Sequence, residues 1–185
     1  MDMNDLYLLV VSLYALFLGF KFIKPLVSEI RFRIFTIFLG LSMIFFFLIT
    51  IFTIKPRPDS DSVSGNGNPG LLVLMFLVPI FLYWLGIWYK FLYKGFQQES
   101  SSTIKKHLLN GSLLFIAGVV LQFYFVSSSL EKLVNHEYNP FEEGYRGSII
   151  NQYTNTLFFN GSTYGIVVSG VLVVTLLVLR YKKLA

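Results

Sequence analysis

The side chains best suited to chemistry lie in one polar stretch, residues 127–163, between the fourth and fifth apolar runs of the sequence. His136 is followed by the carboxylates Glu142 and Glu143, and then by Arg146. Together the imidazole and carboxylates could hold a cation weakly, through a site rich in oxygen ligands. The same composition is typical of a solvated acidic loop, and we favour that interpretation over a metal site.

Composition excludes most other kinds of site. The sequence has no cysteine, which removes disulfides, thiolate metal sites and thiol nucleophiles. Its two histidines, His107 and His136, are expected on opposite membrane faces, so they cannot ligate one metal ion or haem together. The central parts of the apolar runs hold no ionisable residue, the usual mark of a proton relay. We therefore expect no cofactor, no metal ion and no catalytic residue.

The elements that must position these residues are membrane spans. The chain of 185 residues is 55% hydrophobic and 14% charged, against about 25% charged residues in ordinary globular proteins. Its net charge of +5 comes from basic residues that flank apolar runs, so we expect no nucleic-acid partner. The pattern predicts an all-α integral membrane protein, one helical domain over 1–185. The five predicted transmembrane helices are residues 6–23, 34–54, 70–93, 108–126 and 164–180.

The distribution of basic residues predicts the orientation. If the N-terminus lies outside and each run crosses once, eleven of the fifteen lysines and arginines fall on the inner side. These are Lys21, Lys24, Arg31, Arg33, Lys90, Lys94, Lys105, Lys106, Arg180, Lys182 and Lys183. This agrees with the positive-inside rule, so we predict an outer N-terminus and an inner C-terminus, most naturally in the plasma membrane.

The outer segment, residues 127–163, is predicted to contain two short amphipathic helices, the first of which can be continuous with the fourth span. Ser128 and Glu131 fit a capping box, with Leu130 and Leu133 on the apolar face of the first helix. The second helix is expected on the membrane surface, although a hairpin strand is an alternative. Its apolar face would hold Ile149, Ile150, Tyr153, Leu157 and Phe158, with Asn151, Gln152 and Asn155 off it.

Several residues inside the spans carry packing or polar signals. Gly161, Gly165 and Ser169 recur every four residues, which predicts a close helix contact within this chain or with another membrane subunit. Gln122 is predicted to make interhelical hydrogen bonds, and Pro79 to kink its helix. Ser162 or Thr163 is expected to cap the last span.

Aromatic residues gather around Lys90 and Lys94 in the third span. They are Tyr83, Trp84, Trp88, Tyr89 and Tyr93. Such a cluster is typical of an aromatic belt at the membrane interface.

By elimination, the sequence favours a small non-catalytic binding or accessory protein, either a subunit of a membrane complex or an immunity-type protein. It would bind another membrane protein or an extracellular ligand through its outer segment and its small-residue helix faces. The outer segment is favoured because binding sites usually lie on loops held by a rigid scaffold. The candidate contact residues are Leu130, Leu133, His136, Glu142, Glu143, Arg146 and Tyr153. The first alternative is a small permease or channel subunit for an uncharged or lipophilic solute, with a cavity that reaches Gln122 and Pro79. A lipid-modifying enzyme that uses Glu142, Glu143 or His136 is the second.

Overall fold

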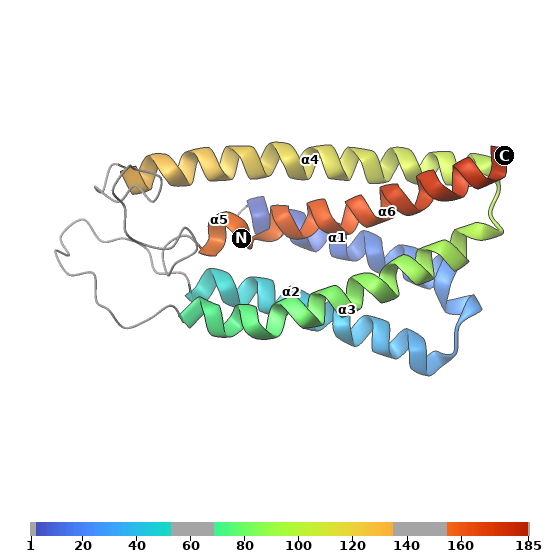
Figure 1. Cartoon of the computed structure of the whole chain (residues 1–185), viewed down its shortest axis with the longest axis horizontal. Coiled ribbons are helices and arrows are strands. Elements are labelled where there is room, and N and C mark those ends of the chain that lie inside the picture. Colours follow the sequence, from blue (N-terminus) through green and yellow to red (C-terminus); the bar gives the residue numbers. More distant parts are fainter. Residues whose placement is uncertain (1–2, 53–68, 135–154, 185) are drawn as a thin grey trace.

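The computed structural model describes residues 3–52, 69–134 and 155–184, and this part of the chain is helical, without a strand (Figure 1). Five of its helices are long and apolar enough to span a membrane, as predicted. In chain order the elements are α1 (Met3–Leu18), η1 (Gly19–Ile23), η2 (Lys24–Leu26), α2 (Glu29–Phe52), α3 (Pro69–Gln97), α4 (Ser101–Val134), α5 (Asn155–Phe158) and α6 (Gly161–Leu184). The predicted spans 6–23, 34–54, 70–93, 108–126 and 164–180 each overlap one long helix, which is longer than predicted at one or both ends.

The first span ends in a change of helix type rather than in a simple break. The backbone N–H of Lys24 donates to the carbonyl oxygen of Gly19, five residues back, which makes η1 a π-helical turn. Pro25 follows in the 3-10 turn η2, and Val27 then has extended backbone angles. Proline cannot donate to an α-helical carbonyl, so the helix widens and then tightens before the chain reverses into α2.

Helix α4 is the longest element, and it extends past the predicted end of its span. The Ser100 hydroxyl caps its first turn by accepting a hydrogen bond from the N–H of Thr103 at 3.1 Å. Its 34 residues correspond to about 51 Å at 1.5 Å per residue. The predicted short helix with Leu130 and Leu133 is therefore the end of α4. The predicted capping box is wrong, because Ser128 lies inside the helix and its hydroxyl donates to the carbonyl of Phe125 at 3.2 Å.

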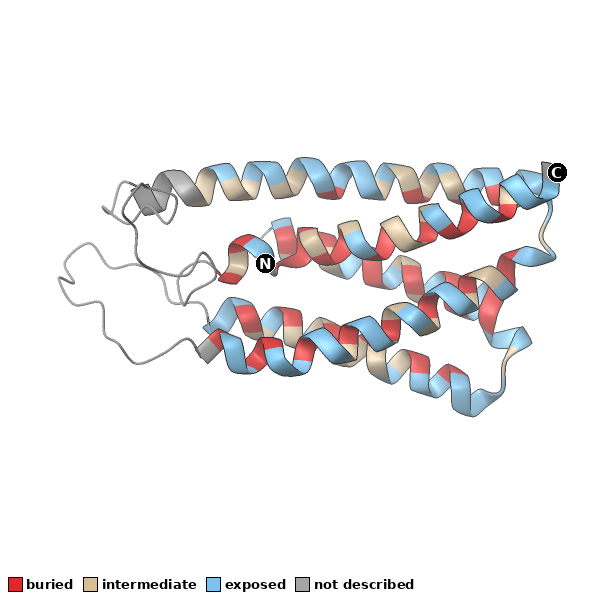
Figure 2. Ribbon diagram, viewed as in Figure 1, coloured by how far each residue is buried: buried red, intermediate tan, exposed pale blue. Residues whose placement is uncertain are grey.

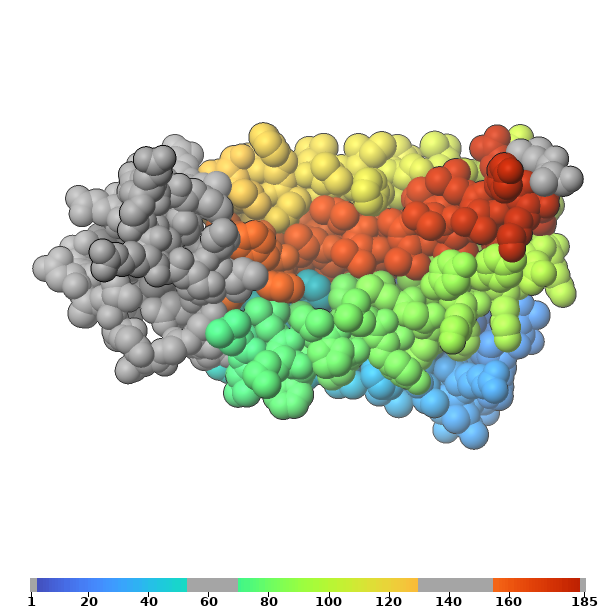
Figure 3. Space-filling model, viewed as in Figure 1, coloured from blue at the N-terminus to red at the C-terminus, as the bar shows by residue number. Residues whose placement is uncertain are grey.

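Helix α6 lies at the centre of the bundle. It packs against α4, α1 and α3, while α2 packs chiefly against α3. Figure 3 shows α6 between α4 and α3 along one face of the molecule. The helices alternate in direction, so the C-terminal ends of α1, α3 and α6 lie at the same end as the start of α2 and α4 (Figure 1). The eleven basic residues counted above lie at or near this basic end of the bundle.

Many large hydrophobic side chains are exposed on the outer surface of the bundle, where Figure 2 shows the exposed residues in pale blue. Large hydrophobic side chains such as Met75 and Phe123 are 72% and 76% exposed. Among the described residues, no buried side chain is aspartate, glutamate, lysine or arginine. Apolar surface on this scale fits lipid as the surrounding solvent, so the chain has the build of a membrane protein.

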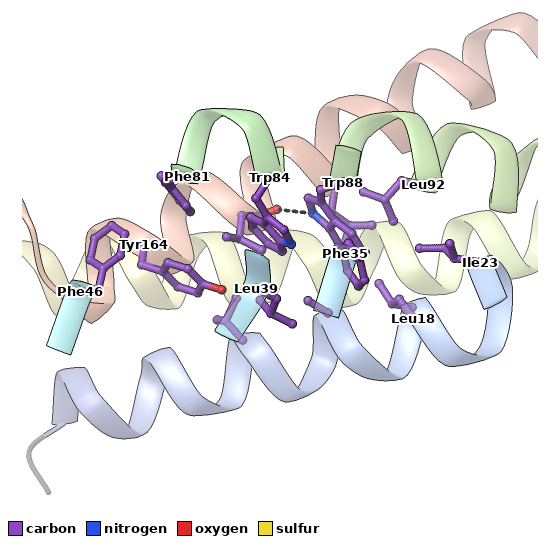
Figure 4. Close-up of a cluster of buried hydrophobic side chains, with 14 of the residues drawn as sticks. Leu18, Ile23, Phe35, Leu39, Phe46, Phe81, Trp84, Trp88, Leu92 and Tyr164 are labelled. Atoms are coloured by element: carbon purple, nitrogen blue, oxygen red, sulfur yellow. Dashed lines mark hydrogen bonds between the residues drawn. The ribbon is translucent and has the colours of Figure 1, made fainter. Parts of the chain in front are cut away.

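The interior is filled by stacked aromatic rings (Figure 4). Trp84 and Trp88 are parallel within 7°, with ring centroids 5.9 Å apart. Phe35 of α2 stacks on both of them, and Tyr164 of α6 stacks on Trp84. The prediction that Trp84 and Trp88 belong to an interfacial belt is wrong, because both are at most 1% exposed. They stand four residues apart on the helix face that also holds Leu77, Phe81 and Leu92, and this face turns inward.

Candidate functional site

A buried polar network lies where α5 leads into α6, at the end of the bundle opposite the basic end. The Asn160 side chain donates to the Gln122 side-chain oxygen of α4 and to the carbonyl of Thr156, each at 2.8 Å. Gln122 in turn donates to the carbonyl of Leu157 at 2.7 Å. Asn160 is 3% exposed. The network therefore fixes α5 and the start of α6 to α4.

The same asparagine caps α6, rather than Ser162 or Thr163 as predicted. Its side-chain oxygen accepts hydrogen bonds from the backbone N–H groups of Ser162 and Thr163, at 2.8 and 3.1 Å. The Thr163 hydroxyl returns the contact by accepting from the N–H of Asn160 at 3.0 Å. This reciprocal arrangement satisfies donors that a helix start leaves unpaired. The sequence carried the signal, since asparagine is among the best N-caps.

The small residues of α6 make room for α1. A Cβ atom at Gly161 would stand 2.0 Å from the carbonyl oxygen of Asn4, and one at Gly165 would stand 2.1 Å from the ring of Tyr7. Ser162 adds a hydrogen bond to the Asn4 side chain at 2.5 Å. The predicted close contact therefore lies within this chain, and the alternative of a second subunit on the Gly161 and Gly165 face is wrong because α1 covers it.

Tyr7 completes this contact, and the sequence analysis did not identify it. Its ring lies against Gly165 of α6 and its hydroxyl lies against Gly118 of α4. The hydroxyl donates to the carbonyl of Leu114. Ser169, the third member of the small-residue pattern, is buried and bonds to the carbonyl of Gly165 at 2.5 Å. One tyrosine thus joins three helices through two glycines.

Gln122 and Pro79 have different surroundings in the described structure. Both polar groups of the Gln122 side chain are engaged by α5 and Asn160. Pro79 lies inside α3 and is exposed on its surface.

The candidate contact residues of the outer segment are less completely placed. Leu130 and Leu133 lie on the last turns of α4, where the backbone is described. His136, Glu142, Glu143, Arg146 and Tyr153 lie outside the described residues, as do Ile149 and Ile150. Of the second predicted helix, α5 is described. There Asn155, predicted to lie off the apolar face, is fully buried, because α5 packs against α2 and α4.

His107, the other candidate histidine, lies near the basic end of the bundle. It is 4% exposed, and its Nδ1 atom stands 2.8 Å from the Tyr14 hydroxyl. The rings of Phe22 and Phe96 meet it edge-on. Within the described ranges, no three histidine, aspartate or glutamate side chains converge on a point that could hold a metal ion.

Comparison of the chain with family models, curated proteins and solved structures finds no match in any of the three.

Proposed function

We propose that this chain is a small, non-catalytic protein of the plasma membrane that binds another membrane protein or an extracellular ligand through residues 127–163. It would serve as the accessory subunit of a membrane complex or as an immunity-type protein. The observation that supports the proposal is the anchoring of this segment at both ends. It starts on the rigid helix α4, and it returns through α5, which is tied to α4 by Gln122 and Asn160. Binding surfaces are commonly loops held in this way by a rigid scaffold.

The packing of the bundle favours binding over transport. The described interior is occupied by the rings of Phe35, Trp84, Trp88 and Tyr164, and its buried polar groups are mostly paired with one another or with backbone. The indole nitrogen of Trp84 is the exception in the described part of the chain. A solute would have to displace large, stacked side chains in order to pass.

The orientation is part of this proposal, with residues 127–163 outside and the basic end in the cytosol. The chain has no cysteine, so single cysteines can report on each side without background. We expect Ser62→Cys and Pro140→Cys to react with a membrane-impermeant maleimide in intact cells, and Ser102→Cys to react after permeabilisation. The reason is the bias of basic residues toward one end. If positions 62 and 140 were protected in intact cells and position 102 were labelled, the orientation would be opposite to the proposed one.

The docking role is tested by site-specific cross-linking in native membranes. A photoreactive p-benzoyl-phenylalanine at position 153 is expected to capture one partner, and the same group at position 62 serves as the control on the other outer loop. Combined substitution of Glu142, Glu143 and Arg146 by alanine should lower the yield at position 153 about tenfold, since a few contact residues usually carry most of the binding energy. Equal cross-linking at positions 62 and 153 would contradict the docking role, and so would a yield at position 153 that the alanine substitutions leave unchanged. Either result would indicate that the segment is only a solvated cover over the helix ends.

A further inference from the structure

A groove opens between α1 and α4 on the outer surface of the bundle. It has a volume of about 300 Å³ and is lined by Val10, Tyr14, Asn110, Leu113 and Leu114. Val10 and Leu113 are 44% and 58% exposed, so the groove faces the surrounding lipid. Its wall is apolar along Val10, Leu113 and Leu114, which suits a hydrocarbon chain.

Two polar side chains interrupt this apolar wall at one level. Asn110 of α4 is half-buried and lines the groove together with Tyr14 of α1, whose hydroxyl is the other polar group there. The same hydroxyl lies 2.8 Å from Nδ1 of the buried His107. An amide carries two donors and an acceptor, so the Asn110 side chain can donate to a partner in the groove.

Beyond this polar level, toward the basic end of the bundle, the groove leads to two lysines. Lys106 precedes Asn110 by one turn of α4, and Lys21, in η1, follows Tyr14 of α1 by seven residues, about two helical turns. The Lys21 ammonium group lies over the rings of Phe17 and Phe22, at 5.7 and 5.1 Å, and Phe17 stacks with Tyr14. Phe22 in turn meets the ring of His107 edge-on, and His107 is the chain neighbour of Lys106, so both lysines belong to the same end of the groove.

These lysines are not neutralised by a carboxylate in the described residues. The ion pair of that part of the chain joins Arg33 to Glu29 on α2, and it includes neither lysine. Lys21 and Lys106 are both exposed, and they stand within two turns of the ends of their spans, Leu26 and Ser101. That is the depth at which lipid headgroups lie.

We infer that the groove between α1 and α4 binds one anionic glycerophospholipid. An acyl chain lies along Val10, Leu113 and Leu114, the ester carbonyl accepts from the Asn110 amide, and the phosphate lies between Lys21 and Lys106. The order of apolar, amide and ammonium groups along the groove follows the order of parts in such a lipid. One helical turn of four residues, about 6 Å, separates Asn110 from Lys106, which matches the spacing between the ester and the phosphate. This site is independent of the outer segment and of the direction in which the chain is inserted.

Native mass spectrometry of the full chain, released from mixed micelles with equal amounts of phosphatidylglycerol and phosphatidylcholine, tests the site. The protein is expected to retain one phosphatidylglycerol in about tenfold preference, because each lysine near a headgroup contributes to anionic lipid binding. Lys21→Gln with Lys106→Gln should remove the preference. The matched control, Arg31→Gln with Lys90→Gln, removes the same charge from α2 and α3 and should keep it.

A second arm tests the ester contact without any change to the lysines. Ether-linked phosphatidylglycerol lacks the ester carbonyls, so the unmodified protein should bind it about fivefold more weakly than the diacyl form. The Asn110→Leu protein should bind ether-linked and diacyl phosphatidylglycerol equally. Equal retention of phosphatidylglycerol and phosphatidylcholine by the unmodified protein would overturn the site. A loss of preference in the Arg31 and Lys90 control would do so as well, because it would show a general charge effect.

Discussion

Replacing Gly161 with alanine is expected to separate α1 from α6 and to destabilise the bundle by about 3 kcal/mol, at the upper end of the range for overpacked interiors. The added Cβ would stand 2.0 Å from the carbonyl oxygen of Asn4 and 2.7 Å from its carbonyl carbon. These are backbone atoms, which cannot move aside as a flexible side chain can. The shift of α1 would also break the hydrogen bond between Ser162 and Asn4. The free energy of unfolding, measured by titration with sodium dodecyl sulfate in mixed micelles, reports the change.

Gly86→Ala is the matched control for this substitution. A Cβ atom at Gly86 would meet nothing within 4 Å, and Gly86 lies inside the long helix α3. Alanine there should stabilise the helix, by at most about 1 kcal/mol. The two glycine substitutions are therefore expected to have opposite signs. A Gly161→Ala protein as stable as the Gly86→Ala protein would show that α1 does not approach α6 this closely.

Replacing Trp88 with alanine is expected to cost about 4 kcal/mol, the range for large aromatic side chains removed from a packed interior. The indole stacks on Trp84 and Phe35, with ring centroids 5.9 and 5.7 Å away. It also donates from its ring nitrogen to the carbonyl of Val168 at 3.3 Å. Since apolar burial gives little preference between helix and lipid, packing contacts of this kind carry the stability of a membrane bundle. Loss of helical circular dichroism during the same detergent titration measures the effect.

Phe123→Ala is the control for the removal of an aromatic ring. Phe123 is 76% exposed on α4, where lipid can fill the space that the ring leaves. We expect a change within about 0.5 kcal/mol, as at other surface positions. If the Trp88 and Phe123 variants lost stability equally, the indole would not be part of a packed core.

The number and order of the apolar helices could be predicted from the sequence because each corresponds to a long, continuous run of apolar residues. Each span is a run of apolar residues closed by charges or by turn residues, and such a run needs no partner to be recognised. The ends of the helices are harder to predict. The three serines after the fourth run are typical of a helix start, yet α4 continues through Ser128 to Val134. Serine can bond back to a carbonyl within a helix as well as cap one, and sequence alone does not distinguish these roles.

A contact within the bundle could be predicted where the residue spacing on a single helix indicates it. The spacing of Gly161 and Gly165 indicated a close approach, but it did not identify Tyr7 as the side chain that fills the space. The prediction of an interfacial position for Trp84 and Trp88 was wrong for a related reason. An aromatic helix face near lysines is compatible with either a membrane interface or a packed core. The partner rings Phe35 and Tyr164 decide between these outcomes, and they come from distant parts of the chain.

The central place of α6 has a consequence for how the protein is made. The ribosome delivers α1, α2, α3 and α4 to the bilayer before α6, yet each of α1, α3 and α4 packs against α6. Until α6 inserts, the ring of Tyr7 lacks Gly165, Ser12 lacks the Tyr164 hydroxyl and the Trp88 nitrogen lacks the carbonyl of Val168. Assembly is therefore completed after synthesis of the fifth span, and until then the surfaces of α1, α3 and α4 that face α6 are not covered by it.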